Sequence, residues 1–147
     1  MRCVRSMRAR RAYTVLELTI VVTMIGLLLA IAFPRIAAVR DRAAVRAAMT
    51  DLGAAFSLAR RTALSRRALV SVVLDTASGT VEVRSAGARL WRRTLGGSYG
   101  IVLGSNRDSA VYDPRGLGYG VSNLSLSVRR GEMVDTLTMS RLGRVRW

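Results

Sequence analysis

The sequence contains no lysine and no histidine, and its only cysteine is Cys3. These absences exclude a Schiff-base lysine, a histidine general base and a zinc site built from histidine and cysteine. A single thiol cannot form a disulfide within the chain. Asp108 and Asp113 are carboxylates without a partner that would orient a nucleophile. We therefore expect a protein that is not an enzyme and that carries no metal and no cofactor.

Aromatic residues are also few, at 5% of the 147 residues, whereas 50% of the chain is hydrophobic. Such a hydrophobic content argues against disorder and predicts a core that is mostly aliphatic. The length suggests one domain with an appended segment. The 24 basic residues, all arginine, outnumber 9 acidic residues and give a net charge of +15. This excess favours an acidic partner, either a membrane surface or nucleic acid, or else a solvated basic face.

The N-terminal third has the pattern of a single membrane span. Residues 1–12 carry five arginines and no acidic residue, and residues 13–34 carry only one charge, at Glu17. At about 1.5 Å per helical residue, 13–34 would span roughly 33 Å. That length matches the hydrocarbon core of a bilayer. Because basic flanks stay in the cytoplasm, we expect the N-terminus there and the remainder on the outer side.

The helical pattern continues beyond the predicted span. We expect one helix from Tyr13 to Arg67, with residues 13–34 in lipid and 35–67 as an amphipathic continuation. Pro34 would kink the helix at the junction, because proline removes a helical hydrogen bond. The continuation carries an apolar stripe with spacings of three and four residues, made of Val45, Met49, Leu52, Phe56, Ala59 and Ala63.

After Arg67 the hydrophobic period changes to two, which is typical of strands. We expect residues 68–147 to form a β domain of about six to eight antiparallel strands, covered by the apolar stripe of the helix. The predicted fold class is α+β, with a long N-terminal helix packed on a small antiparallel sheet. The expected strands are Ala68–Asp75, Thr80–Arg84, Arg89–Leu95, Ile101–Leu103, Ala110–Tyr112, Leu124–Val128 and Val134–Met139.

The segment Ala12-Tyr13-Thr14-Val15-Leu16-Glu17 resembles the processing site of type IV prepilins. The family pattern is glycine followed by Phe-Thr-Leu-x-Glu, so Ala12 and Tyr13 depart from it while Thr14, Leu16 and Glu17 match. The resemblance implies that prepilin peptidase cuts between Ala12 and Tyr13 and that the new amine is methylated. Glu17 becomes the fifth mature residue, which in a filament would pair with the N-terminal amine of a neighbouring subunit. Pro34 falls where pilins often carry a kinking proline.

Later segments resemble the GspH/FimT family, whose members are minor pseudopilins of type II secretion systems or minor pilins of type IV pili. The residues that carry this resemblance are 111–116 (Val-Tyr-Asp-Pro-Arg-Gly), the last two predicted strands and the ending 139–146. The resemblance implies three partners: prepilin peptidase, other pilin or pseudopilin subunits, and the bacterial inner membrane. It also implies a periplasmic C-terminal domain that later joins a periplasmic filament. The sequence does not decide between a secretion pseudopilus and a pilus.

Some pilus members of this family bind DNA through a Gly-Arg-x-Arg ending, which 143–146 matches. In an extended segment, alternation would place Arg144 and Arg146 on one side. Arg141 adds charge nearby, and Trp147 could stack on an exposed base. The alternative is a solvated basic C-terminus that contacts another subunit. A larger basic patch would include Arg129 and Arg130, or Arg92 and Arg93 beside Trp91.

Another class of protein remains open from the same residues. Leu18–Leu29 also fits the apolar region of a secretory signal, and Ala30-Ile31-Ala32 resembles its cleavage site. The product would be a secreted basic binding module that begins at Phe33, or, without cleavage, a simple membrane-anchored one. Glu17 and the continued helical pattern argue against this interpretation.

Overall fold

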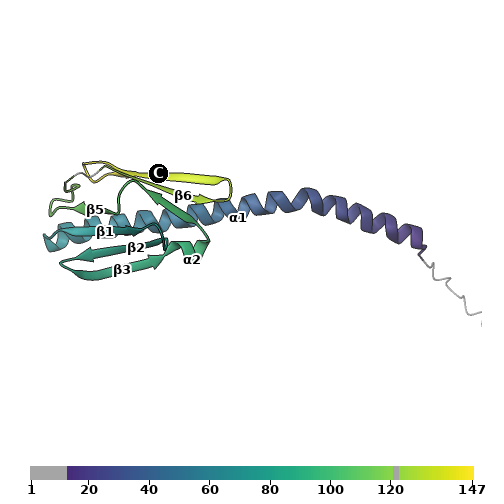
Figure 1. Ribbon diagram of the computed structural model, residues 1–147, viewed down its shortest axis with the longest axis horizontal. Helices are drawn as coiled ribbons and strands as arrows, with labels where there is room; N and C mark the ends of the chain where they lie inside the picture. The colour runs from purple at the N-terminus through teal and green to yellow at the C-terminus, as the bar shows by residue number, and fades with distance from the viewer. Residues whose placement is uncertain (1–12, 121–122) are drawn as a thin grey trace, which may run out of the picture. The chain divides into compact units, whose positions relative to one another are not determined.

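The computed structural model describes residues 13–120 and 123–147. The chain divides into two compact units, of which the first ends at Ile36 and the second runs from Ala37 to Trp147. Figure 1 traces the elements of both units. The second unit holds the sheets and the core.

Helix α1 runs from Val15 to Arg66, so the single long helix predicted from the sequence is confirmed to within two residues at each end. Thr14 caps its start, because the Thr14 hydroxyl accepts the Glu17 backbone N–H at 3.2 Å. A threonine cap with glutamate three residues later is a recognised helix-start signature. Pro34 lies within α1. The leader, residues 1–12, lies outside the described residues.

The second half of α1 buries the predicted apolar stripe. All six of its residues are at most 2% exposed, so the stripe is confirmed. They join residues of both sheets in one hydrophobic cluster. The core is largely aliphatic, as expected, and Tyr112 and Phe56 are its largest fully buried side chains. The predicted α+β class, a long helix packed on a small antiparallel β domain, is confirmed.

The described part of the β domain has eight antiparallel strands, within the six to eight expected, and they form two four-stranded sheets. The first sheet has the order β3-β2-β1-β5 and the second β4-β6-β7-β8. The strands of the first sheet are β1 (Val70–Asp75), β2 (Thr80–Ser85), β3 (Ala88–Thr94) and β5 (Ser109–Tyr112). Those of the second are β4 (Val102–Ser105), β6 (Leu124–Arg130), β7 (Met133–Met139) and β8 (Val145–Arg146).

The split into two sheets arises where the chain leaves β3. Sequence periodicity extended that strand to Leu95, but Leu95 instead begins the short helix α2 (Leu95–Tyr99). The backbone N–H groups of Leu95 and Gly96 both donate to the carbonyl of Gly79, at 2.8 and 3.1 Å. Gly100 ends α2 with a φ of 61°, a left-handed conformation that suits glycine. The chain then enters β4 in the second sheet.

Candidate functional site

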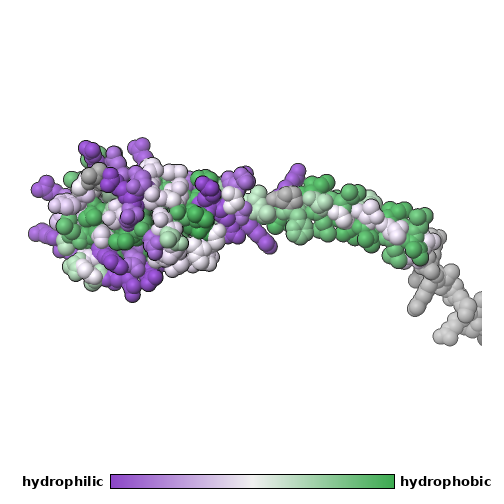
Figure 2. All heavy atoms as spheres, in the orientation of Figure 1, coloured by the Kyte–Doolittle hydropathy of each residue, from purple (hydrophilic) through white to green (hydrophobic). Residues whose placement is uncertain are grey.

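The first unit exposes an apolar helix surface. The part of α1 with the composition of a membrane span is not buried at all within the described residues. Large side chains on it, such as Val15, Leu16 and Phe33, are 70% exposed or more. Figure 2 shows hydrophobic residues along this part of α1 and many hydrophilic residues on the second unit. An exposed apolar surface of this extent is typical of a site that contacts a membrane or another protein.

Glu17 and Tyr13 lie at the start of this helix. Both side chains are exposed, Tyr13 by 77%. Glu17 stands in the first helical turn, where a carboxylate is favoured by the helix dipole. It is the only charged residue between Tyr13 and Pro34. Ala12 falls outside the described residues.

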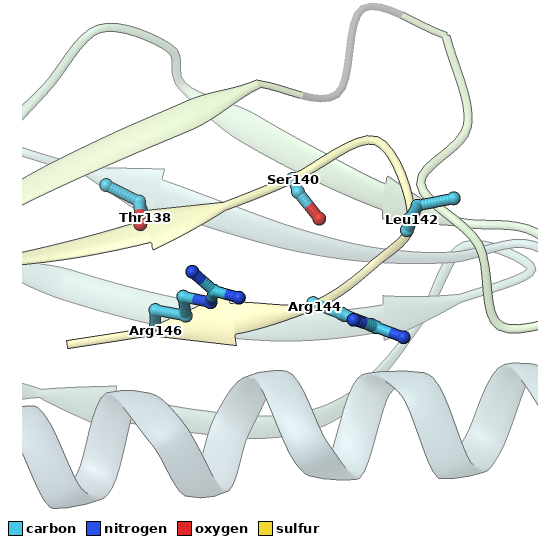
Figure 3. Close-up of a pocket in the computed structure, with 5 residues that line it drawn as sticks. All are labelled: Thr138, Ser140, Leu142, Arg144 and Arg146. Atoms are coloured by element: carbon cyan, nitrogen blue, oxygen red, sulfur yellow. The ribbon is translucent and has the colours of Figure 1, made fainter.

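A second feature lies at the C-terminus. Thr138, Ser140, Leu142, Arg144 and Arg146 line a hollow of about 370 Å³, which we call the C-terminal hollow (Figure 3). Arg144 and Arg146 are both exposed. Neither forms an ion pair with a carboxylate of residues 13–120 or 123–147. Two arginine side chains free to act as donors beside two hydroxyl groups can bind an anion such as phosphate.

Gly143 sets the position of these arginines. Its φ is 68°, and a Cβ there would lie 2.5 Å from the Gly116 carbonyl oxygen and 3.0 Å from Tyr112 Cε1. Its N–H donates to the Ser140 carbonyl at 2.9 Å, and the Ser140 N–H donates to the Arg144 carbonyl at 2.9 Å. This tight turn directs the chain into β8, which pairs with Thr138 and Met139 of β7. Only glycine fits this turn, because any side chain would clash there, and this explains why glycine precedes Arg144.

Trp147 lies against helix α1. An added Cβ on Gly53 would be 2.6 Å from Cη2 of the Trp147 ring. The tryptophan remains 62% exposed. Its contact with Gly53 anchors the end of the chain. Arg141 is exposed but does not line the C-terminal hollow.

Most of the arginines considered for a larger basic patch are paired within the chain. Arg92 lies 3.3 Å from Glu82, and Arg93 lies 3.1 Å from Asp51. Arg130 lies 2.9 Å from Asp41. Trp91 packs against the core. Of the proposed extension only Arg129 is exposed and free of an ion pair among the described residues.

Tyr99 lies at the centre of two of these pairs. Its hydroxyl donates to Asp51 at 2.7 Å and accepts from Arg93 at 3.2 Å. Its backbone carbonyl accepts a hydrogen bond from Arg130. The hydrogen bond to Asp51 raises the pKa of Tyr99, because it stabilises the protonated hydroxyl. We call this cluster of Asp41, Asp51, Arg93, Tyr99 and Arg130 the Tyr99 junction.

Comparisons with known proteins identify the fold. No family model matches the chain, and a search of curated proteins finds no match. Among solved structures, the chain is similar to the type IV minor pilin FimU of Pseudomonas aeruginosa strain PAO1 in its P21 crystal form. The TM-score is 0.61 at 16% identity, covering 71% of this chain and 88% of the other. The P65 form gives a TM-score of 0.57 at 15% identity, with 69% and 90% covered. The chain has a type IV pilin fold.

Two further carboxylates of this chain have hydrogen-bond partners among the described residues. Asp113 accepts the backbone N–H groups of Arg115 and Leu117, at 2.9 and 2.8 Å, and so holds the turn at residues 113–117. The Glu82 carboxylate accepts a hydrogen bond from Arg84 Nε at 2.8 Å, and this bond lowers the pKa of Glu82. Sequence reasoning missed Asp41 and Asp51 as the partners of Arg130 and Arg93. The available signal was that Asp41 and Asp51 are the only acids between 35 and 67, in a segment rich in arginine.

Proposed function

We propose that this chain is a minor pilin or pseudopilin of a type IV pilus or type II secretion system. In this proposal prepilin peptidase cuts between Ala12 and Tyr13, and the mature subunit joins a filament through its N-terminal helix. The observation that carries the proposal is a pilin fold together with an apolar helix surface that the described chain does not bury. Lipid would cover that surface before assembly, and neighbouring helices would cover it afterwards.

In this proposal Glu17 aligns neighbouring subunits along the filament. In a bundle of apolar helices, an unpaired carboxylate is costly. The N-terminal amine that cleavage creates on Tyr13 of a neighbouring subunit would supply the opposite charge. Away from water the attraction between the two is much stronger than in bulk solvent. The subunit would wait in the inner membrane with its N-terminus in the cytoplasm and its second unit in the periplasm.

The test uses the full chain expressed in its native host. We expect mass spectrometry of the membrane protein to find a chain that begins with N-methylated Tyr13. We expect Glu17→Ala to remain in the membrane fraction but to be lost from the filament fraction. Glu132→Ala is the matched control, because Glu132 is an exposed acid of the second unit, and it should assemble normally.

Two outcomes would overturn the proposal. A chain that begins at Phe33 would indicate ordinary secretion, and an intact Met1 would indicate a static anchor. Normal filament entry of Glu17→Ala would remove the assigned role of that residue. If the proposal holds, neighbouring genes would distinguish the two systems. Genes for a secretion ATPase and a secretin indicate a type II secretion system, and pilus or competence genes indicate a type IV pilus.

DNA capture is a second candidate function, favoured by the two unpaired arginines of the C-terminal hollow. If both contact phosphates, Arg144→Ala/Arg146→Ala should reduce the slope of log K against log salt by about 1.8. Arg61→Ala/Arg66→Ala removes the same charge from exposed positions of α1 and is the control. Binding of duplex DNA by the full chain in detergent measures both. Equal slopes for the two double variants would exclude the hollow as the DNA site.

A further inference from the structure

Strand β7 has an edge that is only partly paired. It is seven residues long, but β8 pairs with just two of them, Thr138 and Met139. On its other side β7 pairs along its whole length with β6. No described strand pairs with the β8 side of β7 between Met133 and Leu137. This open edge is the starting point of the inference.

The register shows which backbone groups point outward. In an antiparallel ladder, alternate residues direct their N–H and C=O groups to opposite neighbours. Arg130 and Met133 flank the two-residue turn that joins β6 to β7, so Met133 bonds toward β6. Val134 and Thr136 therefore face the β8 side, as Thr138 does. The Thr136 N–H is capped by the neighbouring Asp135 carboxylate at 2.8 Å. No described residue hydrogen-bonds the Val134 backbone on that side.

A groove runs beside this edge. It has a volume of about 280 Å³ and is lined by Arg42, Val45 and Arg46 of α1 and by Met133, Val134 and Asp135 of β7. We call it the β7 groove. Val134 is 53% exposed, which is high for a valine in a sheet. The groove thus combines an open backbone edge with a helix wall.

The helix wall is positively charged. Arg42 and Arg46 stand one helical turn apart and are exposed, and neither forms an ion pair with a described carboxylate. Like charges at this spacing destabilise a helix unless an anion lies between them. Asp135 is the only acid that lines the groove, and its carboxylate is already engaged by the Thr136 N–H. The wall therefore favours a carboxylate brought by a partner.

We propose that the β7 groove binds an extended acidic peptide segment of a partner protein as an added strand. The segment would pair with the outward backbone groups at Val134 and Thr136, displacing the Asp135 cap, and would place a carboxylate against Arg42 and Arg46. Strand addition of this type takes its affinity from backbone hydrogen bonds and its specificity from alternate side chains. A nucleic acid lacks the peptide N–H and C=O groups that the edge requires. A second copy of this chain is disfavoured by charge, because residues 13–147 carry 19 arginines and only 9 acidic residues.

The test uses the full chain in detergent micelles and capped synthetic peptides of alternating valine and glutamate. We expect saturable binding, together with slower hydrogen exchange in β7 around Val134. A peptide with lysine in place of glutamate should not bind. A glutamate peptide methylated at every backbone nitrogen keeps the charge but has no N–H donor for the ladder on either edge, and it should lose roughly tenfold or more in affinity. This comparison leaves the protein unchanged, so folding defects cannot affect it.

Variants of the chain locate the contact. Arg42→Glu/Arg46→Glu should weaken binding of the glutamate peptide roughly tenfold or more. Arg61→Glu/Arg66→Glu makes the same charge change on exposed positions of the same helix and should have little effect. Absent binding, equal binding of the methylated peptide, or equal loss in the two double variants would overturn the proposal. Displacement of the peptide by duplex DNA with the same dependence on Arg42 and Arg46 would also overturn it and would assign the groove to nucleic acid.

Discussion

The contact between Trp147 and Gly53 can be tested by a double-mutant cycle. Gly53 lies in the interior of α1, where glycine is less favourable than alanine by about 1 kcal/mol. In isolation Gly53→Ala should therefore stabilise the protein. However, the new Cβ would lie 2.6 Å from Trp147 Cη2, so the indole ring must move away. The same substitution therefore stabilises the helix and removes the packing of Trp147 against it.

The size of the loss follows from the exposure of the ring. Trp147 is 62% exposed, so a little over a third of its surface is covered. With about 250 Å² for a whole tryptophan, the covered part is about 90 Å² and contributes about 2 kcal/mol. Ordering the last residue costs about 1 kcal/mol, which leaves a net contribution of about 1 kcal/mol. Gly53→Ala should thus be nearly neutral in the wild type and stabilising by about 1 kcal/mol in Trp147→Ala.

The assay is urea unfolding of the full chain in detergent, followed by circular dichroism of the β domain for all four members of the cycle. The expected coupling between the two positions is about 1 kcal/mol. A control cycle pairs Trp147→Ala with Gly87→Ala, because nothing lies within 4 Å of a Cβ at Gly87, and should show no coupling. Full stabilisation by Gly53→Ala in the presence of Trp147 would refute the contact.

Three further predictions concern stability in the same urea assay. Gly131→Ala should cost about 2 kcal/mol, because alanine is strained at a φ of 54° and its Cβ would lie 2.6 Å from Asp41 Oδ2; unchanged stability would contradict the close approach. The hydrogen bond from Arg84 lowers the pKa of Glu82 in the folded protein. Ionised Glu82 therefore stabilises the fold above its usual pKa of 4.5, and this stabilisation is lost as the pH falls through the lowered pKa of the folded state. Glu82→Gln should flatten that acid limb. Burial raises the pKa of Tyr112 to about 12, so stability should fall between its usual pKa of 10 and about 12, and Tyr112→Phe should remove this alkaline loss.

The sequence predicted best those elements whose signal is local and repeated. The stripe from Val45 to Ala63 repeats over many turns, and it is buried as expected. The hairpins β1–β2 and β6–β7 each combine alternating strands with a short turn, and both form. Helix α2 and strand β8 were missed because they are five and two residues long and depend on distant contacts. The carbonyl of Gly79 holds the start of α2, and no local pattern indicates that.

The candidate sites show the same division. Alternation suggested that Arg144 and Arg146 share a side, and both line the C-terminal hollow. The ion pairs of Arg93 and Arg130 could not be predicted from sequence spacing, because their partners are far away in the chain. Arg93 and Asp51 are 42 residues apart, and Arg130 and Asp41 are 89 apart. Such pairs depend on how strands are distributed between two sheets.

The Tyr99 junction has a consequence for how the second unit comes apart. The two sheets share no strand, so no backbone ladder obliges them to open together. Arg93 of the first sheet pairs with Asp51 of α1, and Arg130 of the second sheet pairs with Asp41 of α1. Tyr99 accepts a hydrogen bond from each of these two arginines. Loosening one sheet would disturb the hydrogen bonds through which the other sheet contacts α1. We therefore expect the two sheets to open together, so that hydrogen exchange slows to a similar extent in both.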